Sequence, residues 1–262
     1  MLTFDTPDPI TADIDVEYGR VRVIARDRKT TVADVRPSNE KRKADVEAAE
    51  KTRVDFVDGR LEVRTARLRR LGLFGRPGSI EVVVQLPSGS QIQGLVSYGD
   101  FDVEGRAGDC AIKTSYGNVR VGEAGAVELH TSYGDIDVGR AAGAEISLSW
   151  GTIRIGEANG ATNIKSAGGD IVVEKARGDI QARTSYGDVR VTQAARGSLT
   201  LATAFGALRV GVARGTATHL DLVAESGTVR NDLEESDGQV KTEDTLAVRA
   251  HTKYGDISIS RA

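Results

Sequence analysis

The sequence predicts an all-β fold: a parallel β-solenoid (β-helix) with two short strands in each turn of about 18 residues. The main observation is a glycine series that recurs every 17–19 residues and in most cases follows an aromatic residue. That series is Gly99, Gly117, Gly134, Gly151, Gly169, Gly187 and Gly206. A second glycine series has the same spacing. Its members up to Gly197 each lie eight or nine residues before the next glycine of the first series. The second series is Gly108, Gly125, Gly143, Gly160, Gly178, Gly197 and Gly215. A fixed period of this size is the signature of a solenoid, and two glycines per period predict two corners per turn.

Apolar and polar residues alternate between the corners, as expected of strands with one buried face. Val127 and Leu129 alternate with polar neighbours before Gly134, and Ile136 and Val138 do so after it. One such turn cannot bury its own apolar face. Stacking turns about 4.8 Å apart would bury a continuous core between the two rows of strands.

The first part of the sequence lacks this period and is expected to cap the solenoid. Residues 11–36 alternate as strands do, and further strands are expected around residues 53–57, 60–65 and 79–86. Residues 38–51 are the one convincing helix, with Ser38 as a plausible N-cap. Because a solenoid end exposes unpaired strand edges and core, we expect residues 1–90 to form an N-terminal β-rich cap.

The solenoid itself is expected to occupy residues 91–262. An acidic insertion at about residues 231–244 interrupts the period, and one last turn follows it. We expect the insertion to be a surface loop, with folding over the open end of the solenoid as an alternative.

Composition excludes several classes of protein. The net charge is −3 and the pI about 5.8, so the overall basic footprint of a nucleic-acid-binding protein is absent. The one cysteine excludes an intrachain disulfide and a CxxC zinc or redox motif. No stretch of about 18 apolar residues and no signal-peptide pattern occurs, so a cytoplasmic protein is expected.

The repeat units TSYGDIDV (131–138) and TSYGDVRV (184–191) resemble those of a bacterial β-strand-repeat family that carries an adhesin label and is also called the toastrack family. The N-terminal FDTPDPITADIDVEYGRVRVIARDR and the terminal KYGDISISR are similar to its actinobacterial members. The resemblance implies a β-helix with no defined catalytic residues. Some members accompany envelope-stress systems, so it also implies a link to that response.

One residue at each corner of the first series forms the aromatic corner ladder, which comprises Tyr98, Tyr116, Tyr133, Trp150, Tyr186 and Phe205. Stacked corners would bring these rings within stacking distance, so a structural role at the edge of the core is expected. The alternative is binding of a sugar or an aromatic ligand. Gly168 takes the slot between Trp150 and Tyr186 and would either leave a notch for such a ligand or be required only by the backbone.

A second candidate is the basic segment at residues 64–78. Its residues of interest are Arg67, Leu68, Arg69, Arg70, Leu71, Leu73, Phe74 and Arg76. Such a mixture can contact an anionic membrane surface or an acidic partner. Alternatively, it is a cap hairpin whose leucines pack inward and whose arginines are solvated.

Catalytic, metal and cofactor sites are not predicted. Aspartates follow many corner glycines, at Asp100, Asp135, Asp170, Asp188 and Asp256, but the GGxGxD motif of calcium β-rolls is absent. Corner aspartates more often stabilise a turn by a side-chain hydrogen bond. His130, His219 and His251 lie in different turns, and Cys110 has the inward parity of a buried residue.

The leading hypothesis is a non-catalytic scaffold that binds an unidentified protein partner. The first alternative is a structural solenoid that polymerises head-to-tail by self-association through its ends. The second alternative is a solenoid that binds or hydrolyses carbohydrate through the aromatic corner ladder.

Overall fold

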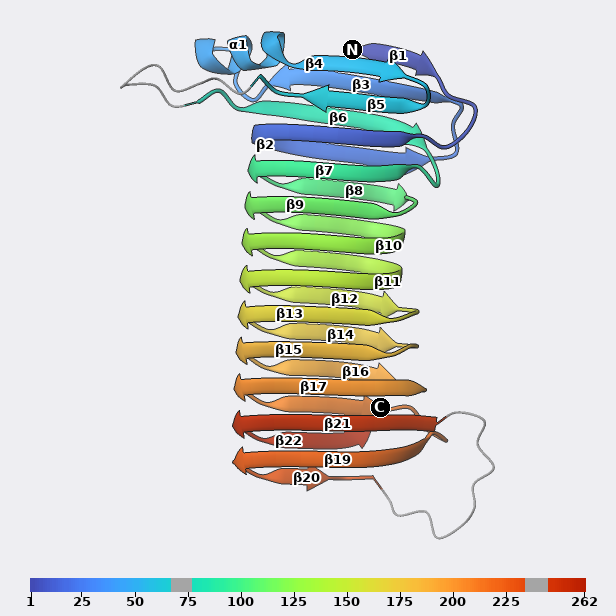
Figure 1. Cartoon of the computed structure of the whole chain (residues 1–262), viewed down its shortest axis with the longest axis vertical. Helices are drawn as coiled ribbons and strands as arrows, with labels where there is room; N and C mark the ends of the chain where they lie inside the picture. Colours follow the sequence, from blue (N-terminus) through green and yellow to red (C-terminus); the bar gives the residue numbers. More distant parts are fainter. Residues whose placement is uncertain (67–76, 234–244) are drawn as a thin grey trace. The chain divides into compact units, whose positions relative to one another are not determined.

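The computed structural model describes residues 1–66, 77–233 and 245–262. The chain divides into two compact units, unit 1 with residues 1–132 and unit 2 with residues 133–262. Each unit is a stack of parallel two-strand turns, so the predicted β-solenoid is confirmed (Figure 1). Residues 67–76 of the basic segment and residues 234–244 of the acidic insertion lie outside the described residues.

Unit 2 begins with regular turns that match the sequence period. Its strands here are β11 (Ile136–Trp150), β12 (Ile153–Ala158), β13 (Thr162–Gly168), β14 (Ile171–Ala176), β15 (Ile180–Tyr186), β16 (Val189–Ala194), β17 (Gly197–Phe205) and β18 (Leu208–Val212). β13, β15 and β17 pair in parallel in one sheet. β12, β14, β16 and β18 pair in parallel in the opposite sheet.

The core lies between these two sheets because equivalent apolar residues stack in register. Ile164 pairs with Ala182, which in turn pairs with Leu201. In the opposite sheet Ile155 pairs with Val173. All of these side chains are buried, which confirms the inward positions expected from the alternation.

The aromatic corners bring successive backbones so close together that only glycine fits. Gly206 has a φ of +153°, and a Cβ added to it would lie 2.1 Å from the Gly187 carbonyl oxygen. The same carbonyl accepts a hydrogen bond from the Thr203 hydroxyl, at 3.0 Å. Thr131, Thr184 and Thr252 donate in the same way to the corner carbonyls of Gly117, Gly169 and Gly206.

The C-terminal turns do not stack in sequence order. The strands are β19 (Ala217–Ser226), β20 (Val229–Asn231), β21 (Thr245–Tyr254) and β22 (Ile257–Arg261). β21 pairs in parallel with β17 on one side and with β19 on the other. β22 likewise lies between β18 and β20. The last turn of the sequence is thus the penultimate turn of unit 2, and β19 with β20 forms the outermost one (Figure 1).

In unit 1, too, the first strands of the sequence do not stack in sequence order. Its strands are β1 (Leu2–Asp5), β2 (Thr11–Arg26), β3 (Thr30–Pro37), β4 (Arg53–Val57), β5 (Arg60–Arg64), β6 (Ile80–Pro87), β7 (Gln91–Tyr98), β8 (Phe101–Arg106), β9 (Cys110–Tyr116) and β10 (Val119–Tyr133). β2 supplies both strands of one turn. It pairs in parallel with β7 and β8 on one side and with β5 and β6 on the other. Residues 11–26, expected in the cap, therefore form a solenoid turn despite lacking the period.

Antiparallel strands and a helix close the outer end of unit 1. β4 pairs with β5, and β3 pairs with both β6 and β1. Phe4 and Phe56 stack with ring centroids 5.0 Å apart over this end. Short antiparallel edge strands of this kind protect a sheet from further pairing.

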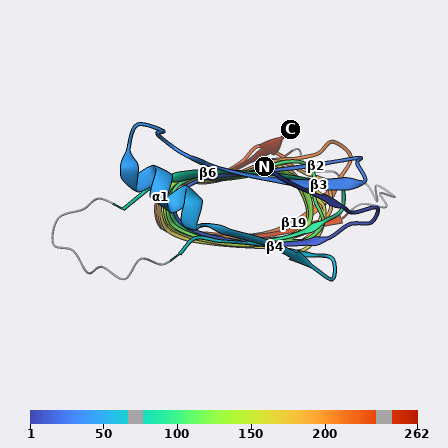
Figure 2. The ribbon, with the colours of Figure 1, turned by 90° about the horizontal axis from the view of Figure 1, so that it is seen from above.

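The helix is shorter than expected. α1 spans Lys43–Lys51 with Arg42 at its N-cap position, so the prediction of a helix starting at Ser38 is wrong. The Ser38 hydroxyl instead hydrogen-bonds the Ser79 hydroxyl, at 2.9 Å. Asp45, in the first turn, accepts the Ser79 backbone N–H at 2.9 Å, which ties α1 to the start of β6 (Figure 2). Within the described residues, no helix has the length and apolar character needed to span a membrane.

Candidate functional site

In unit 1 the aromatic corner ladder forms a stack of parallel rings. Tyr98 and Tyr116 stack with centroids 5.1 Å apart and planes within 1°. Tyr18, from β2, extends the stack at 4.8 Å from Tyr98. The expected stacking at this corner is therefore present in unit 1, with one more ring than the ladder predicted.

Unit 2 contains a second stack of the same kind. Tyr186 and Phe205 stack at 5.1 Å, and Phe205 stacks on Tyr254 at 4.9 Å. Tyr254 was not among the expected ladder residues because 49 residues separate it from Phe205. The Tyr-Gly pair was the available signal, as it was for Tyr18.

The rings lie at the rim of the core and remain half exposed. The exposed fraction is 44–55% for Tyr98, Tyr116, Tyr133, Trp150, Tyr186, Phe205 and Tyr254. Because each stacked ring covers the face of its neighbour, ring edges and phenolic hydroxyls make up the surface offered to solvent.

The notch expected at Gly168 is filled. A Cβ on Gly168 would lie 2.4 Å from Cζ3 of the Trp150 indole, so the indole itself occupies the space above this glycine. The larger ring of Trp150 explains why the next slot holds no side chain. The prediction of a notch here is wrong.

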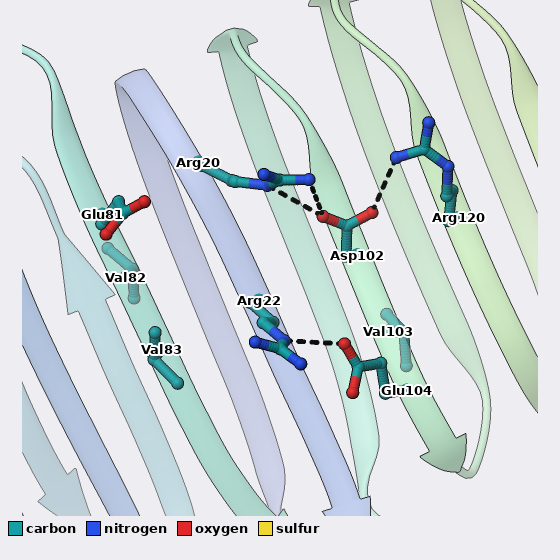
Figure 3. A pocket seen from close by; sticks show the side chains of 9 residues that line it. All are labelled: Arg20, Arg22, Glu81, Val82, Val83, Asp102, Val103, Glu104 and Arg120. Carbon is teal, nitrogen blue, oxygen red and sulfur yellow. Dashed lines mark hydrogen bonds and ion pairs between the residues drawn. The ribbon is translucent and has the colours of Figure 1, made fainter. Parts of the chain in front are cut away.

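A cluster of paired charges lies on the outer face of the sheet in unit 1 that contains β8 and its neighbours β2 and β10 (Figure 3). Asp102 of β8 accepts a hydrogen bond from Arg20 of β2 at 3.0 Å and another from Arg120 of β10 at 3.3 Å. Arg22 of β2 donates to Glu104 of β8 at 2.7 Å. These side chains line a hollow of about 370 Å³ together with Glu81, Val82, Val83 and Val103.

The charges in this hollow compensate one another. Asp102 is only 8% exposed and has two guanidinium partners, and the hydrogen bond from Arg22 lowers the pKa of Glu104. Three arginines and three carboxylates line the hollow, so its formal charges sum to zero. Its contacts join β2 to β8, two strands that are distant in sequence, which indicates a structural clamp.

The corner aspartates serve the backbone of the adjacent turn. Asp135 Oδ1 accepts the Thr152 N–H at 2.8 Å, and Asp170 Oδ1 accepts the Asp188 N–H at 2.8 Å. Among the residues that the structure describes, no group of three or more His, Cys, Asp or Glu side chains could hold a metal ion. The geometry therefore supports hydrogen bonding to the backbone, rather than calcium binding, as the role of the corner aspartates.

The remaining reactive side chains are separated. Cys110 is buried, and burial, followed by the charge of Asp109, raises the pKa of its thiol to about 12. A thiol of this kind is a poor nucleophile. His251 contacts Glu225 at 2.9 Å on the surface of unit 2. The basic-segment residues Arg67 to Arg76 lie outside the described residues, so their predicted contacts stay predictions.

The chain matches a known family over nearly its whole length. The family profile described as Toastrack DUF4097 matches residues 12–260. No curated protein matches the chain in sequence. Among solved structures, a protein from Bacteroides fragilis, provisionally described as an adhesin, is 12% identical with a TM-score of 0.46, and the match covers 98% of this chain and 95% of that one. A protein from Parabacteroides distasonis with the same provisional description is 14% identical with a TM-score of 0.43, and the match covers 100% and 95% of the two chains.

A third similar structure, also from Parabacteroides distasonis, carries a provisional description as a lipid-binding protein, with 12% identity, a TM-score of 0.44 and coverage of 100% and 95%. The family match agrees with the glycine corners, the two-strand turns and the Tyr-Gly-Asp units found in both compact units. This chain belongs to the toastrack family.

Proposed function

We propose that this protein is a non-catalytic scaffold that binds a protein partner along the aromatic corner ladder. The observation that carries the proposal is the row of half-exposed, stacked rings at one corner of each unit. Tyrosine, tryptophan and phenylalanine are among the residues enriched at protein–protein interfaces. Within each unit they are placed at regular intervals along one edge.

The rings are also held in place before any partner arrives. Stacking at 5.1 Å with planes within 4° fixes the orientation of Tyr186 and Phe205. Binding a partner usually costs about 0.5–1.5 kcal/mol for each flexible side chain that becomes ordered. Rings that are already ordered avoid most of this cost, which suits a docking surface.

Most of the side chains that directly precede the rings in the sequence are small and leave the ring edges accessible. In unit 2 the residues before Trp150, Tyr186 and Phe205 are small, namely Ser149, Ser185 and Ala204, with Lys253 before Tyr254 as the exception. In unit 1 Ser97 and Ser115 hold the same place. A partner can therefore approach the rings from the side without displacing long side chains.

The geometry favours a protein over a carbohydrate at this site. A sugar ring usually binds by packing on the open face of an aromatic ring. In unit 1 the Tyr98 ring is stacked on both sides, by Tyr18 and by Tyr116. In unit 2 Phe205 is likewise covered on both faces. Edges and hydroxyls remain, and these match the mixed polar and apolar surface of a protein.

A comparison of two variants in the native host tests the proposal. Tyr98→Ser combined with Tyr116→Ser removes two ladder rings from unit 1. The matched control, Lys113→Ser combined with Glu128→Ser, removes an exposed ion pair of 3.5 Å from the same sheet face. Affinity purification with quantitative mass spectrometry should recover a partner with wild type and control but not with the ladder variant. Equal recovery with all three proteins would contradict the proposal.

A further inference from the structure

The outer edge of unit 2 is an unusually open strand. β19 is ten residues long, and its one described partner is β21. β20, in the opposite sheet, pairs with β22 alone among the described strands. The outer backbone groups of both strands are therefore without a partner in the described part of the chain.

The core-facing side of this last turn is also incompletely covered. Leu220 and Leu222 pair with the buried Val248 and Ala250, so they have inward parity, yet they are only half-buried. Val229 pairs with the fully buried Ile257 and is itself 47% exposed.

Apart from the carboxylates Asp221 and Glu225, β19 lacks the usual features that prevent strand pairing. Natural edge strands are short, or carry lysine, proline, a bulge or an inward-pointing charge. The sequence of β19, ATHLDLVAES, has no lysine or proline, and its four inward positions are Thr218, Leu220, Leu222 and Ala224. In unit 1, by contrast, the edge strands β1 and β4 have four and five residues.

The carboxylates on β19 already have cationic or hydrogen-bonding partners on β21. Asp221 contacts Arg249 at 3.0 Å, and Glu225 contacts His251 at 2.9 Å. Repulsion by exposed carboxylates is the remaining obstacle to pairing two copies of this strand. These contacts reduce it.

We propose that the open edge of unit 2 binds a second copy of this chain, with β19 of each copy pairing antiparallel across a two-fold axis at Leu222. An isologous contact of this kind is closed by symmetry and gives a dimer. It goes beyond the proposed scaffold role, because it uses β19 and not the aromatic corner ladder.

Charge and the length of strand that is paired together select the register. With the axis at Leu222, His219 lies opposite Glu225 of the second copy, twice by symmetry, and Asp221 lies opposite Val223. An axis at Asp221 would place this carboxylate opposite itself, and an axis at Val223 would place Asp221 opposite Glu225. Like charges directly opposite each other destabilise a strand pair. The Leu222 register avoids both clashes and pairs residues 218–226 along almost the whole strand.

Cysteine substitution tests the contact and its register in the full chain. Cα atoms of directly opposite residues in an antiparallel pair lie about 4.5–5.5 Å apart, within disulfide reach. Leu222→Cys should therefore form an intermolecular disulfide under mild oxidation. Leu220→Cys, a matched control with the same inward parity, should not, because it faces Ala224 of the second copy. Mixing Leu220→Cys with Ala224→Cys chains should restore the cross-link, and the native Cys110 is buried and does not interfere.

Sedimentation equilibrium of the wild type gives an independent test that needs no variant. We expect the mass to rise with concentration from 27.8 kDa to twice that value and to stop there. A monomer at all concentrations would overturn the proposal, and so would masses that continue beyond the dimer. Equal cross-linking by Leu220→Cys and Leu222→Cys would overturn the register.

Discussion

The tightest physical constraint in the structure is the backbone contact at the aromatic corners, and Gly206→Ala tests it. A methyl group at Gly206 would lie 2.1 Å from the Gly187 carbonyl oxygen, so one corner must move. The φ of +153° adds strain of about 1–3 kcal/mol for a residue with a Cβ. Moving the Gly187 carbonyl also weakens its hydrogen bond from Thr203, which is worth about 1 kcal/mol.

We therefore expect Gly206→Ala to lower the free energy of unfolding by about 2–4 kcal/mol, the sum of these contributions. Two matched glycines separate the causes. Gly215 has a φ of +80° and no atom within 4 Å of an added Cβ, so Gly215→Ala should show the strain alone, about 1–2 kcal/mol. Gly143 has neither positive φ nor an atom closer than 3.4 Å, so Gly143→Ala should cost less than about 1 kcal/mol.

Urea unfolding followed by circular dichroism measures the three midpoints under identical conditions. The expected order of destabilisation is Gly206→Ala, then Gly215→Ala, then Gly143→Ala. If Gly206→Ala were no more destabilising than Gly215→Ala, the close stacking of corners would be wrong.

Three further predictions follow from specific contacts. Asp102→Ala should lower the free energy of unfolding by about 1–2 kcal/mol, because two guanidinium groups lose their acceptor; an unchanged urea midpoint would refute the clamp. Burial alone would raise the pKa of Asp188, but its hydrogen bonds and the arginine charges lower it overall, so the ionised carboxylate stabilises the fold above the unfolded pKa of about 3.9 and this stabilisation is lost as pH falls through the lower folded pKa. Acid unfolding of Asp188→Asn should lack this loss of stability. Parallel stability curves for wild type and Asp188→Asn would contradict the prediction. Cysteines at positions Ala202 and His251, partners in neighbouring strands, should form a disulfide, whereas cysteines at Ala202 and Val223 should not; the reverse result would mean that the turns stack in sequence order.

Much of the regular fold can be read from the sequence because each turn repeats the same local physics. Corner glycines mark where a Cβ would collide with the turn before, and alternation marks the inward positions. Ile136 and Val138 were expected to alternate toward the core on this basis, and both are buried. The stacking of Tyr98 on Tyr116 follows from the same register.

The order of the terminal turns could not be read in this way, since strand pairing across long gaps leaves no local period. Tyr18 stacks on Tyr98 although 80 residues separate them, and only the shared Tyr-Gly pair hints at it. At the other end, residues 217–231 carry two marks of a terminal turn. Ser226 stands in the aromatic slot opposite Tyr254, and the polar Asn231 takes an inward position opposite Ile259. The terminal repeats of solenoids often depart from the repeat pattern in this way.

The candidate site was only partly predictable. The ladder positions followed from the period, but the half exposure of the rings depends on how the corner turns away from the core after the last inward threonine. The filled space above Gly168 depends on the size and rotamer of the Trp150 indole, which spacing alone does not give. The clamp at Asp102 required knowing that β2 lies beside β8, a pairing between distant segments.

Photo-crosslinking in the native host tests the central claim, that a partner docks on the aromatic corner ladder, most directly. Tyr116 is replaced by the photoreactive aromatic p-benzoylphenylalanine, and the control places the same residue at Lys113, an exposed position on the same strand. The account predicts a discrete cross-linked protein from position 116 that is absent or much weaker from position 113. No adduct at position 116, or the same adducts from both positions, would contradict it.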